Sequence, residues 1–166
     1  METATYNGQV LERCECEGGY GGDATSPNVQ CTPCKTSTGW KNYNANTPCT
    51  QCPPGSIIDP DVEVAIFETS CMCGLNAELN ADTGRCECSA GYGGDATNPS
   101  IGCSACGTTS YKSDVGNTQC TTCPAGASIA GGGMNATSSD SCACGLNAEL
   151  NAELGRCECS AGYRGD

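Results

Sequence analysis

Residues 71–95 read CMCGLNAELNADTGRCECSAGYGGD, and residues 142–166 read CACGLNAELNAELGRCECSAGYRGD. The two stretches start 71 residues apart and agree at 21 of 25 positions. Each contains two Cys-x-Cys doublets, and the similarity continues outward from them. Self-similarity at a fixed period is typical of repeat architectures, in which every copy is one small structural unit. The sequence therefore predicts tandem modules.

The cysteines define the repeat. Starting at Cys14, four doublets follow one another in the order CxC, CxxC, CxxC, CxC, and the same order returns from Cys86 with a shift of at most one residue. The predicted segments are the end of a preceding repeat (1–13), repeat 1 (14–85), repeat 2 (86–156) and the start of a third repeat (157–166). We therefore expect the sequence to be a section of a longer array.

The composition predicts modules that are held by cross-links. Cysteine accounts for 18 of the 166 residues, the net charge is −12, and Leu, Ile, Val and Phe together make up about a tenth of the chain. Such a chain buries too little apolar surface to offset its conformational entropy, whereas each disulfide contributes roughly 2–4 kcal/mol. The predicted fold class is small and disulfide-rich: a linear array of short β-hairpin and loop modules without a large hydrophobic core.

All 18 cysteines are expected to form disulfides. A Cys-x-Cys doublet does not readily close on itself, so each doublet should send its two sulfurs to other doublets and form a ladder. Eight cysteines allow 105 pairings, and the sequence does not choose among them. The cysteines are Cys14, Cys16, Cys31, Cys34, Cys49, Cys52, Cys71, Cys73, Cys86, Cys88, Cys103, Cys106, Cys120, Cys123, Cys142, Cys144, Cys157 and Cys159.

Two further motifs recur in each repeat. In C-x-C-x-x-G-Y-x-G-D, the glycines Gly18–Gly19, Gly91 and Gly162 are expected to adopt positive φ in tight turns between short strands. An aromatic residue followed by lysine, Trp40–Lys41 or Tyr111–Lys112, precedes an Asn-Thr pair and the next doublet. That doublet is followed by proline and then by the most variable part of the repeat.

The variable part is expected to face the solvent. In repeat 1, SIIDPDVEVAIFE, the alternation of Val62, Val64 and Ile66 predicts a half-buried strand. In repeat 2, SIAGGGMNATSS, three consecutive glycines predict a loop. The LNAELNA stretch that follows has leucines four residues apart, which suits either helical turns or a hairpin arm.

The order CxCxxGYxG, then CxxC, then an aromatic–Lys pair with Asn-Thr-x-Cys-x-x-Cys-Pro resembles the ephrin-receptor-like cysteine-rich repeats, relatives of EGF-like and tumour-necrosis-factor-receptor-like modules. The resemblance covers nearly the whole chain and is clearest at residues 111–124, YKSDVGNTQCTTCP. It implies an extracellular protein, because such arrays occur in mastigoneme and cell-coat fibres of unicellular eukaryotes. It implies neither an EGF disulfide pairing nor calcium binding, because the Tyr-to-Cys spacing is longer and the acidic residues before the first cysteine are missing.

The composition argues against several functional classes. The chain has no histidine, which removes His-based acid–base catalysis, Cys–His nucleophiles and His metal ligands. We therefore expect no enzyme activity, catalytic residue or cofactor. The net charge of −12 disfavours nucleic acid and anionic membrane surfaces as partners. Membrane insertion is not expected, because no stretch approaches the roughly 18 apolar residues of a membrane span.

The sequence thus predicts an extracellular structural protein, secreted or at the cell surface. Its modules would stack into a disulfide-stapled rod or filament whose partners are copies of the same chain. Covalent glycans are expected as well. Asn135, in Asn135-Ala136-Thr137, is the only N-glycosylation sequon.

Two alternatives remain open. The first is the stalk or ligand-binding ectodomain of a cell-surface receptor or adhesin. Its candidate contact residues are Trp40, Ile57, Ile58 and Phe67. The second is a metal-thiolate protein, because Cys31-x-x-Cys34 and Cys49-x-x-Cys52 are spaced much like a Cys₄ zinc site.

Overall fold

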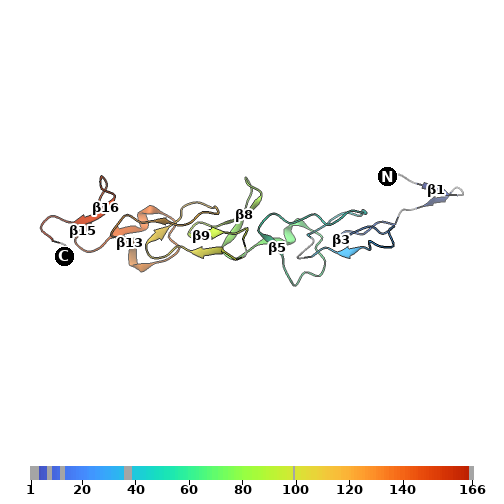
Figure 1. Cartoon of the computed structure of the whole chain (residues 1–166), viewed down its shortest axis with the longest axis horizontal. Coiled ribbons are helices and arrows are strands. Elements are labelled where there is room, and N and C mark those ends of the chain that lie inside the picture. The colour runs from blue at the N-terminus through green and yellow to red at the C-terminus, as the bar shows by residue number, and fades with distance from the viewer. Residues whose placement is uncertain (1–3, 7–8, 12–13, 36–38, 99, 165–166) are drawn as a thin grey trace. The chain divides into compact units, whose positions relative to one another are not determined.

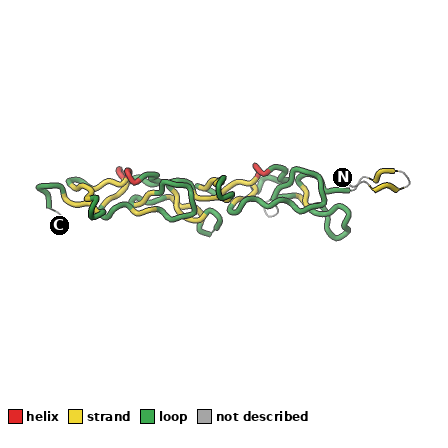
Figure 2. Tube along the Cα trace, turned by 90° about the horizontal axis from the view of Figure 1, so that it is seen from above, coloured by secondary structure: helices red, strands yellow, loops and turns green. Residues whose placement is uncertain are grey.

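The computed structural model describes residues 4–6, 9–11, 14–35, 39–98 and 100–164, so the predicted segments 1–13 and 157–166 lie partly outside the described residues. Within the described part, the helices are three single-turn 3₁₀ helices, and every other regular element is a short strand. Figure 2 shows that loops and turns make up most of the chain. None of the described helices has the length and apolar character that a membrane crossing requires.

The strands pair only with their neighbours in sequence and form eight two-stranded sheets among the described residues. The strands are β1 (Ala4–Tyr6), β2 (Gln9–Leu11), β3 (Tyr20–Gly21), β4 (Thr32–Pro33), β5 (Ser56–Ile58), β6 (Cys71–Cys73), β7 (Ala77–Asn80), β8 (Arg85–Cys88), β9 (Tyr92–Asp95), β10 (Gly102–Ala105), β11 (Ser110–Tyr111), β12 (Thr121–Thr122), β13 (Ala127–Ile129), β14 (Cys142–Cys144), β15 (Ala148–Asn151) and β16 (Arg156–Cys159). The 3₁₀ helices are η1 (Glu68–Ser70), η2 (Ala130–Gly132) and η3 (Ser139–Ser141).

The chain forms two compact units, residues 1–72 and 73–166. Within the second unit, the hairpins that contain β9, β13 and β15 follow one another in chain order (Figure 1). Short local hairpins of this kind, with no large core, agree with the predicted fold class of small disulfide-rich hairpin modules.

The LNAELNA stretch is a hairpin arm in both copies, which settles the choice between helix and hairpin. In the β7–β8 turn, the side-chain oxygen of Asn80 accepts from the N–H of Asp82 at 2.9 Å, and the N–H of Gly84, at φ 66°, donates to the Asn80 carbonyl at 2.8 Å. Asn151 and Gly155 repeat this arrangement between β15 and β16. Asn and Gly favour such turns because Asn bonds to the backbone ahead of it and Gly tolerates positive φ.

Eight disulfides link each cysteine doublet to the next doublet along the chain. The pairs are Cys16–Cys31, Cys34–Cys49, Cys52–Cys71, Cys73–Cys86, Cys88–Cys103, Cys106–Cys120, Cys123–Cys142 and Cys144–Cys157. The expected ladder is therefore present, and each link joins a doublet to the nearest doublet that follows it.

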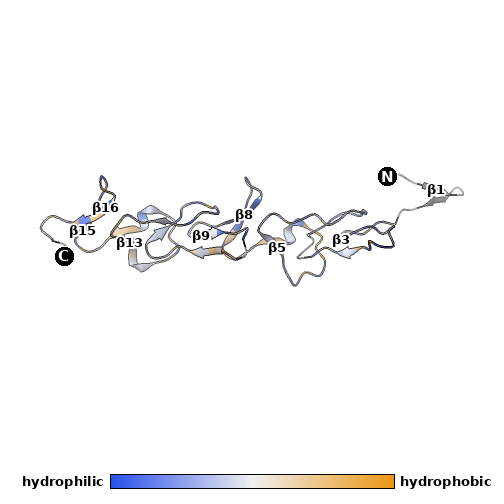
Figure 3. Cartoon of the chain, viewed as in Figure 1, coloured by the Kyte–Doolittle hydropathy of each residue, from blue (hydrophilic) through white to orange (hydrophobic). Residues whose placement is uncertain are grey.

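Each unit has only a small apolar cluster. In the first unit Cys34, Ile58 and Ala65 are buried, and Trp40 packs against them. In the second unit the apolar cluster consists of Cys123, Ala127, Ile129 and Ala136, with Tyr111 packed against them. Figure 3 shows that hydrophobic residues otherwise occur in short, scattered stretches. Clusters this small do not stabilise a domain by themselves, so the disulfides have to contribute.

The half-buried strand predicted at Val62–Ile66 is wrong. The strand in this part of repeat 1 is β5, which pairs with β6, and the chain then turns at Asp59, where the N–H of Val62 donates to the Asp59 carbonyl at 2.9 Å. Beyond the turn the backbone has no neighbouring strand, and the N–H of Ala65 donates to the carbonyl of Cys34 at 2.7 Å. The alternating pattern does not mark a buried face, because Ala65 is fully buried whereas Ile66 is 40% exposed.

Candidate functional site: a buried lysine in each repeat

Repeat 2 buries a lysine at its centre. Lys112 is 5% exposed, and its ammonium group donates hydrogen bonds to the backbone carbonyls of Cys88 (3.0 Å), Tyr92 (2.9 Å) and Gly116 (2.6 Å). An ammonium group has three donors, so these three bonds use its full capacity. The lysine therefore holds the first doublet, the glycine–tyrosine strand and the turn before Cys120 together.

Repeat 1 contains a similar arrangement, in which two of the three carbonyls correspond to those of repeat 2 and the third, that of Thr47, takes the place of the Cys88 carbonyl. Lys41 is fully buried, and its ammonium donates to the carbonyls of Tyr20 at 2.8 Å and Thr47 at 3.3 Å, and also to the carbonyl of Ala45. In addition, the ammonium lies 5.6 Å from the centre of the Tyr43 ring, a cation–π distance. Two independent copies thus place a lysine among three backbone carbonyls.

The backbone of each lysine connects two further segments. In repeat 2 the N–H of Gly91 donates to the Lys112 carbonyl at 2.8 Å, and the Lys112 N–H donates to the carbonyl of Ala136 at 3.0 Å. Repeat 1 has the same two bonds at 2.6 and 3.1 Å. The glycine turn at the start of the repeat is thereby joined to the variable segment near its end.

An asparagine completes the polar interior. The side-chain oxygen of Asn117 accepts from the N–H groups of Cys88 (3.2 Å) and Ala96 (2.9 Å), and its amide donates to the carbonyl of Cys86 at 3.1 Å. Asn46 makes the three equivalent bonds in repeat 1, at 3.1, 3.0 and 2.9 Å. This asparagine fixes the path of the Cys-x-Cys doublet, which in repeat 1 lies outside any strand and in repeat 2 belongs to β8 and pairs with β7.

Glycine is required where the chain passes the second disulfide of each repeat. A Cβ atom on Gly93 would lie 2.8 Å from the nitrogen of Cys120 and 2.9 Å from its sulfur, and one on Gly21 would lie 2.6 and 2.7 Å from the same atoms of Cys49. The predicted turn glycines are confirmed in part. Gly19, Gly91 and Gly162 have positive φ, whereas Gly18 does not.

Burial and neighbouring groups shift the pKa values of the charged residues around the buried lysine of repeat 2. Burial lowers the pKa of Lys112, and the negative charges of Glu87 and Asp114 partly oppose this effect. Hydrogen bonds from Asn80 and then Arg85 lower the pKa of Glu87. With its three donors engaged and its access to solvent blocked, the lysine is not placed to act as a nucleophile or base. Its role is to donate hydrogen bonds to carbonyl groups in the interior of the repeat, one of which, that of Cys88, also accepts from the N–H of Gly116.

The four cysteines that could form a zinc site, between residues 31 and 52, are divided among three disulfides. Their partners are Cys16, one another and Cys71. A disulfide-bonded sulfur is not the thiolate that zinc needs. In the part of the chain that the structure describes, no group of three or more His, Cys, Asp or Glu residues is arranged to hold a metal ion.

Of the 18 predicted disulfide cysteines, Cys14 and Cys159 are free and exposed. Cys86, the counterpart of Cys14, bonds to the doublet before it, and Cys88, the counterpart of Cys159, bonds to the doublet after it. The two thiols therefore occupy positions that form links between doublets elsewhere in the array.

The sequon lies on the surface of repeat 2. Asn135 is exposed and has a φ of 61°, a region that asparagine tolerates better than most residues. Its side-chain nitrogen, the atom to which an N-linked glycan is attached, donates to the hydroxyl of Tyr92 at 3.1 Å.

The four candidate contact residues do not form one surface. Trp40 and Ile58 belong to the apolar cluster of repeat 1, whereas Ile57 and Phe67 are exposed. Ile58 also has a counterpart in repeat 2, the buried Ile129. The set of candidate contact residues chosen from the sequence therefore contains both interior and surface positions.

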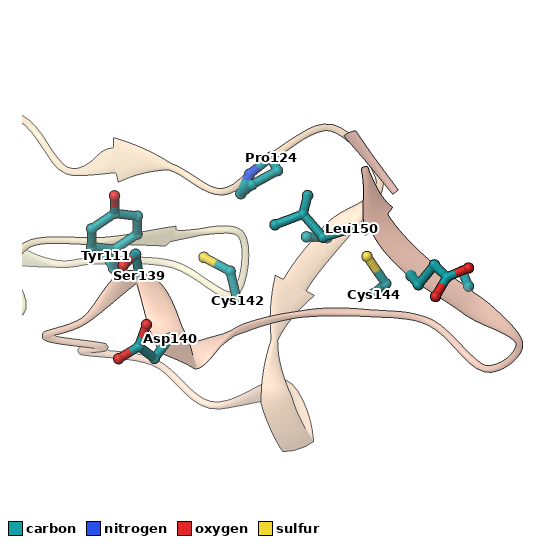
Figure 4. A pocket seen from close by; sticks show the side chains of 10 residues that line it. Tyr111, Pro124, Ser139, Asp140, Cys142, Cys144 and Leu150 are labelled. Carbon is teal, nitrogen blue, oxygen red and sulfur yellow. The ribbon is translucent and has the colours of Figure 1, made fainter. Parts of the chain in front are cut away.

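A hollow of about 440 Å³ lies between neighbouring hairpins of the second unit. Figure 4 shows Tyr111, Pro124, Cys142 and Leu150 around it, with Asp140 on η3 at its rim. Among its lining residues the only charged groups are the carboxylates of Asp140 and Glu149. It offers apolar and acidic surface and no cationic group.

Compared with models of known protein families and with curated proteins, the chain matches none. The fold and the site define a class of structure: small disulfide-rich hairpin modules whose interiors are centred on a hydrogen-bonded lysine. The resemblance to ephrin-receptor-like repeats rests on sequence motifs and stays a prediction.

The buried lysines were not predicted from the sequence. The chain has only three lysines, and two of them follow an aromatic residue at the same place in both repeats. That recurrence, in a strongly acidic chain, is the signal that could have identified them. It does not by itself reveal which carbonyls surround them, because these lie up to 24 residues away.

Proposed function

We propose that the chain is an extracellular structural repeat protein that forms a disulfide-stapled rod or filament with copies of itself. The observation that supports this most directly is its covalent connectivity. Because each doublet bonds to the next, the disulfides and the one or two residues inside each doublet form an unbroken covalent path from Cys16 to Cys157. The remaining residues form loops that lie outside this path.

Tension along the chain would pass through this path. From Cys16 to Cys88 it contains four disulfides with Cα–Cα distances of 5.5, 5.8, 5.7 and 5.6 Å. Together with about ten peptide steps, these allow a maximum length of about 60 Å per repeat, whereas the reduced repeat would extend to about 250 Å. A module of this kind suits a load-bearing fibre, because its maximum length stays the same when the loops outside the covalent path unfold.

The surface chemistry supports an extracellular location. Disulfides persist in oxidising compartments, so the eight disulfides of this chain favour a location outside the cell. Burial of Lys41 and Lys112 removes two of the seven basic residues from the surface and leaves it still more acidic. Acidic faces, with a glycan on Asn135, would keep neighbouring rods hydrated and apart.

The mechanical part of the proposal is tested by stretching single molecules. Cys14 and Cys159 are free and exposed, so thioether handles can be attached to them without touching the other cysteines. The oxidised chain should lengthen to no more than about 130 Å between the handles, and the reduced and alkylated chain to about 500 Å. Extension of the oxidised chain by several hundred ångströms would contradict the proposed path.

Assembly is tested separately by electron microscopy of the oxidised chain over a range of concentrations. The proposal predicts threads of uniform width whose number grows with concentration. Single particles of monomer mass at every concentration would contradict the filament.

A further inference from the structure

The two repeats present different surfaces at the same place in the module. Residues 57–72 of repeat 1 correspond without a gap to residues 128–143 of repeat 2 when the cysteines are aligned. The inward-facing residues agree, since Ile58 and Ile129 are both buried. The outward-facing residues do not agree.

Repeat 1 exposes four large apolar side chains in this segment: Ile57 (51% exposed), Ile66 (40%), Phe67 (61%) and Met72 (47%). We refer to them as the repeat 1 patch. Their counterparts in repeat 2 are Ser128, Thr137, Ser138 and Ala143. All four positions thus change from apolar to small or hydroxyl-bearing residues, and Thr137 belongs to the sequon.

The members of the patch lie on adjoining elements. Ile57 and Met72 are the middle residues of β5 and β6, which pair with each other. In the equivalent hairpin of repeat 2, the middle residues Ser128 and Ala143 stand opposite each other. Phe67 directly precedes η1, which leads into β6, and its carbonyl accepts from the N–H of Ser70 at 3.0 Å. One hairpin with its entry turn therefore carries Ile57, Met72 and Phe67, and Ile66 directly precedes Phe67.

Acidic residues accompany the apolar ones. The segment 57–72 contains Asp59, Asp61, Glu63 and Glu68 and no basic residue, whereas 128–143 contains only Asp140. Asp59 is half-buried, and the other three are exposed. Exposed apolar side chains in a segment with four acidic residues complement a partner that carries apolar residues between lysines or arginines. A second copy of the chain is a poor match, because its net charge is −12 and two of its seven basic residues are buried.

We propose that the repeat 1 patch binds a basic, amphipathic segment of another protein, and that repeat 2 lacks this site. The proposal adds a binding function to one repeat of the structural array. The array would then carry recognition on a repeat whose interior is the same as that of its neighbour.

The test uses a fluorescein-labelled ten-residue peptide of alternating lysine and leucine, with fluorescence anisotropy measured at physiological salt. The matched variant I57S/I66T/F67S/M72A replaces each patch residue by its repeat 2 counterpart, so the net charge is unchanged and every new residue already occurs at that place in the same fold. We expect this variant to bind the peptide at least tenfold more weakly. Equal binding by the two proteins would overturn the proposal, because attraction by the acidic surface alone would then explain the affinity.

A second variant, D59N/D61N/E63Q/E68Q, keeps the apolar residues and removes the four negative charges of the segment 57–72. It is also expected to bind at least tenfold more weakly, and unchanged binding would overturn the basic character of the partner. Intact mass must show eight disulfides in each variant. If the fourfold apolar variant does not form them, the double variant I57S/F67S replaces it with the same criterion.

Sedimentation velocity and electron microscopy distinguish a partner from a second copy. The wild type and the apolar variant should self-associate equally and form the same filaments. Self-association or filaments in the wild type alone would assign the patch to assembly and overturn the proposal. Filament formation tests the structural function in both proteins, so the two proposals can fail separately.

Discussion

Repeats 1 and 2 agree in their interiors and differ on their surfaces. Lys41 and Lys112 are buried among three carbonyls each, and Asn46 and Asn117 make the same three bonds. In contrast, repeat 1 has an exposed apolar patch where repeat 2 has a sequon and small residues. The comparison indicates that a polar, cross-linked interior leaves the surface free to vary.

The physical reason lies in the directional nature of the interior contacts. An ammonium group that serves three carbonyls, or an amide that serves three backbone groups, has no substitute of similar size that would satisfy the same atoms. An exposed side chain has water as its alternative partner. A change there costs little, so a patch or a glycan can be added to one repeat without affecting its fold.

Replacement of a buried lysine should have the largest effect, because it should destabilise one repeat and leave the other unchanged. Lys112→Met removes the ammonium donor from three interior carbonyls, of which that of Cys88 keeps the N–H of Gly116 at 2.9 Å. At about 1–3 kcal/mol for each of the other two, repeat 2 should lose about 2–6 kcal/mol. Hydrogen exchange of the oxidised chain should show reduced protection at residues 88–123 and unchanged protection at residues 16–52. Lys41→Met should produce the opposite pattern.

Arg164→Met is the control for charge, because Arg164 is exposed. It should leave protection unchanged in both repeats. An equal loss in both repeats after Lys112→Met would show that the modules do not hold their interiors independently.

The close approach of glycine to the disulfide should have the next largest effect. Gly93→Ala forces a Cβ atom against the backbone of Cys120, and overpacking of this kind costs about 1–3 kcal/mol. The midpoint of denaturation should fall, and Gly21→Ala should have a similar effect in repeat 1, where Trp40 fluorescence reports it. Gly107→Ala, which meets no atom within 4 Å, should have no such effect and serves as the control.

The smallest effect on stability is expected from acid titration of Asp23 and Asp95, which occupy the same turn in the two repeats. Hydrogen bonds from the Thr25 and Thr97 side chains, and then from their backbone N–H groups, lower the pKa of Asp23 and Asp95 below the ordinary value of 3.8. The unfolded chain therefore binds protons more readily than the folded chain in this range. The stabilisation is present above pH 3.8 and is lost as the pH falls through the lower folded pKa.

Carboxyl titration by NMR should show a pKa below 3.8 for both Asp23 and Asp95. Thr25→Val and Thr97→Val should each return the neighbouring pKa toward 3.8. If the pKa of one aspartate stayed low after its threonine was replaced, a cause other than this hydrogen bond would have to be found for that repeat.

Much of the fold was predictable because its elements are local. The turn glycines Gly19 and Gly91 adopt the positive φ that their motif predicts, and the disulfides connect neighbouring doublets only 13–19 residues apart. The alternation at Val62–Ile66 misled the prediction, because burial in a loop depends on the local contact of each residue and not on its place in a pattern: Ala65 is buried and Ile66 is exposed.

The sequence by itself determined the module: the doublet order sets the number and size of the loops, and the scarcity of apolar residues requires cross-links instead of a core. Only the tertiary structure decided which half-cystines pair, that Lys41 and Lys112 lie inside, and that Ile57 and Phe67 face outward while Trp40 and Ile58 do not. These facts depend on atoms brought together from distant positions, as when the carbonyls of Cys88 and Gly116 meet at one ammonium group. The spacing of residues along the chain does not predict which distant groups come into contact. Burial likewise depends on the surroundings of a residue and not on the residue alone.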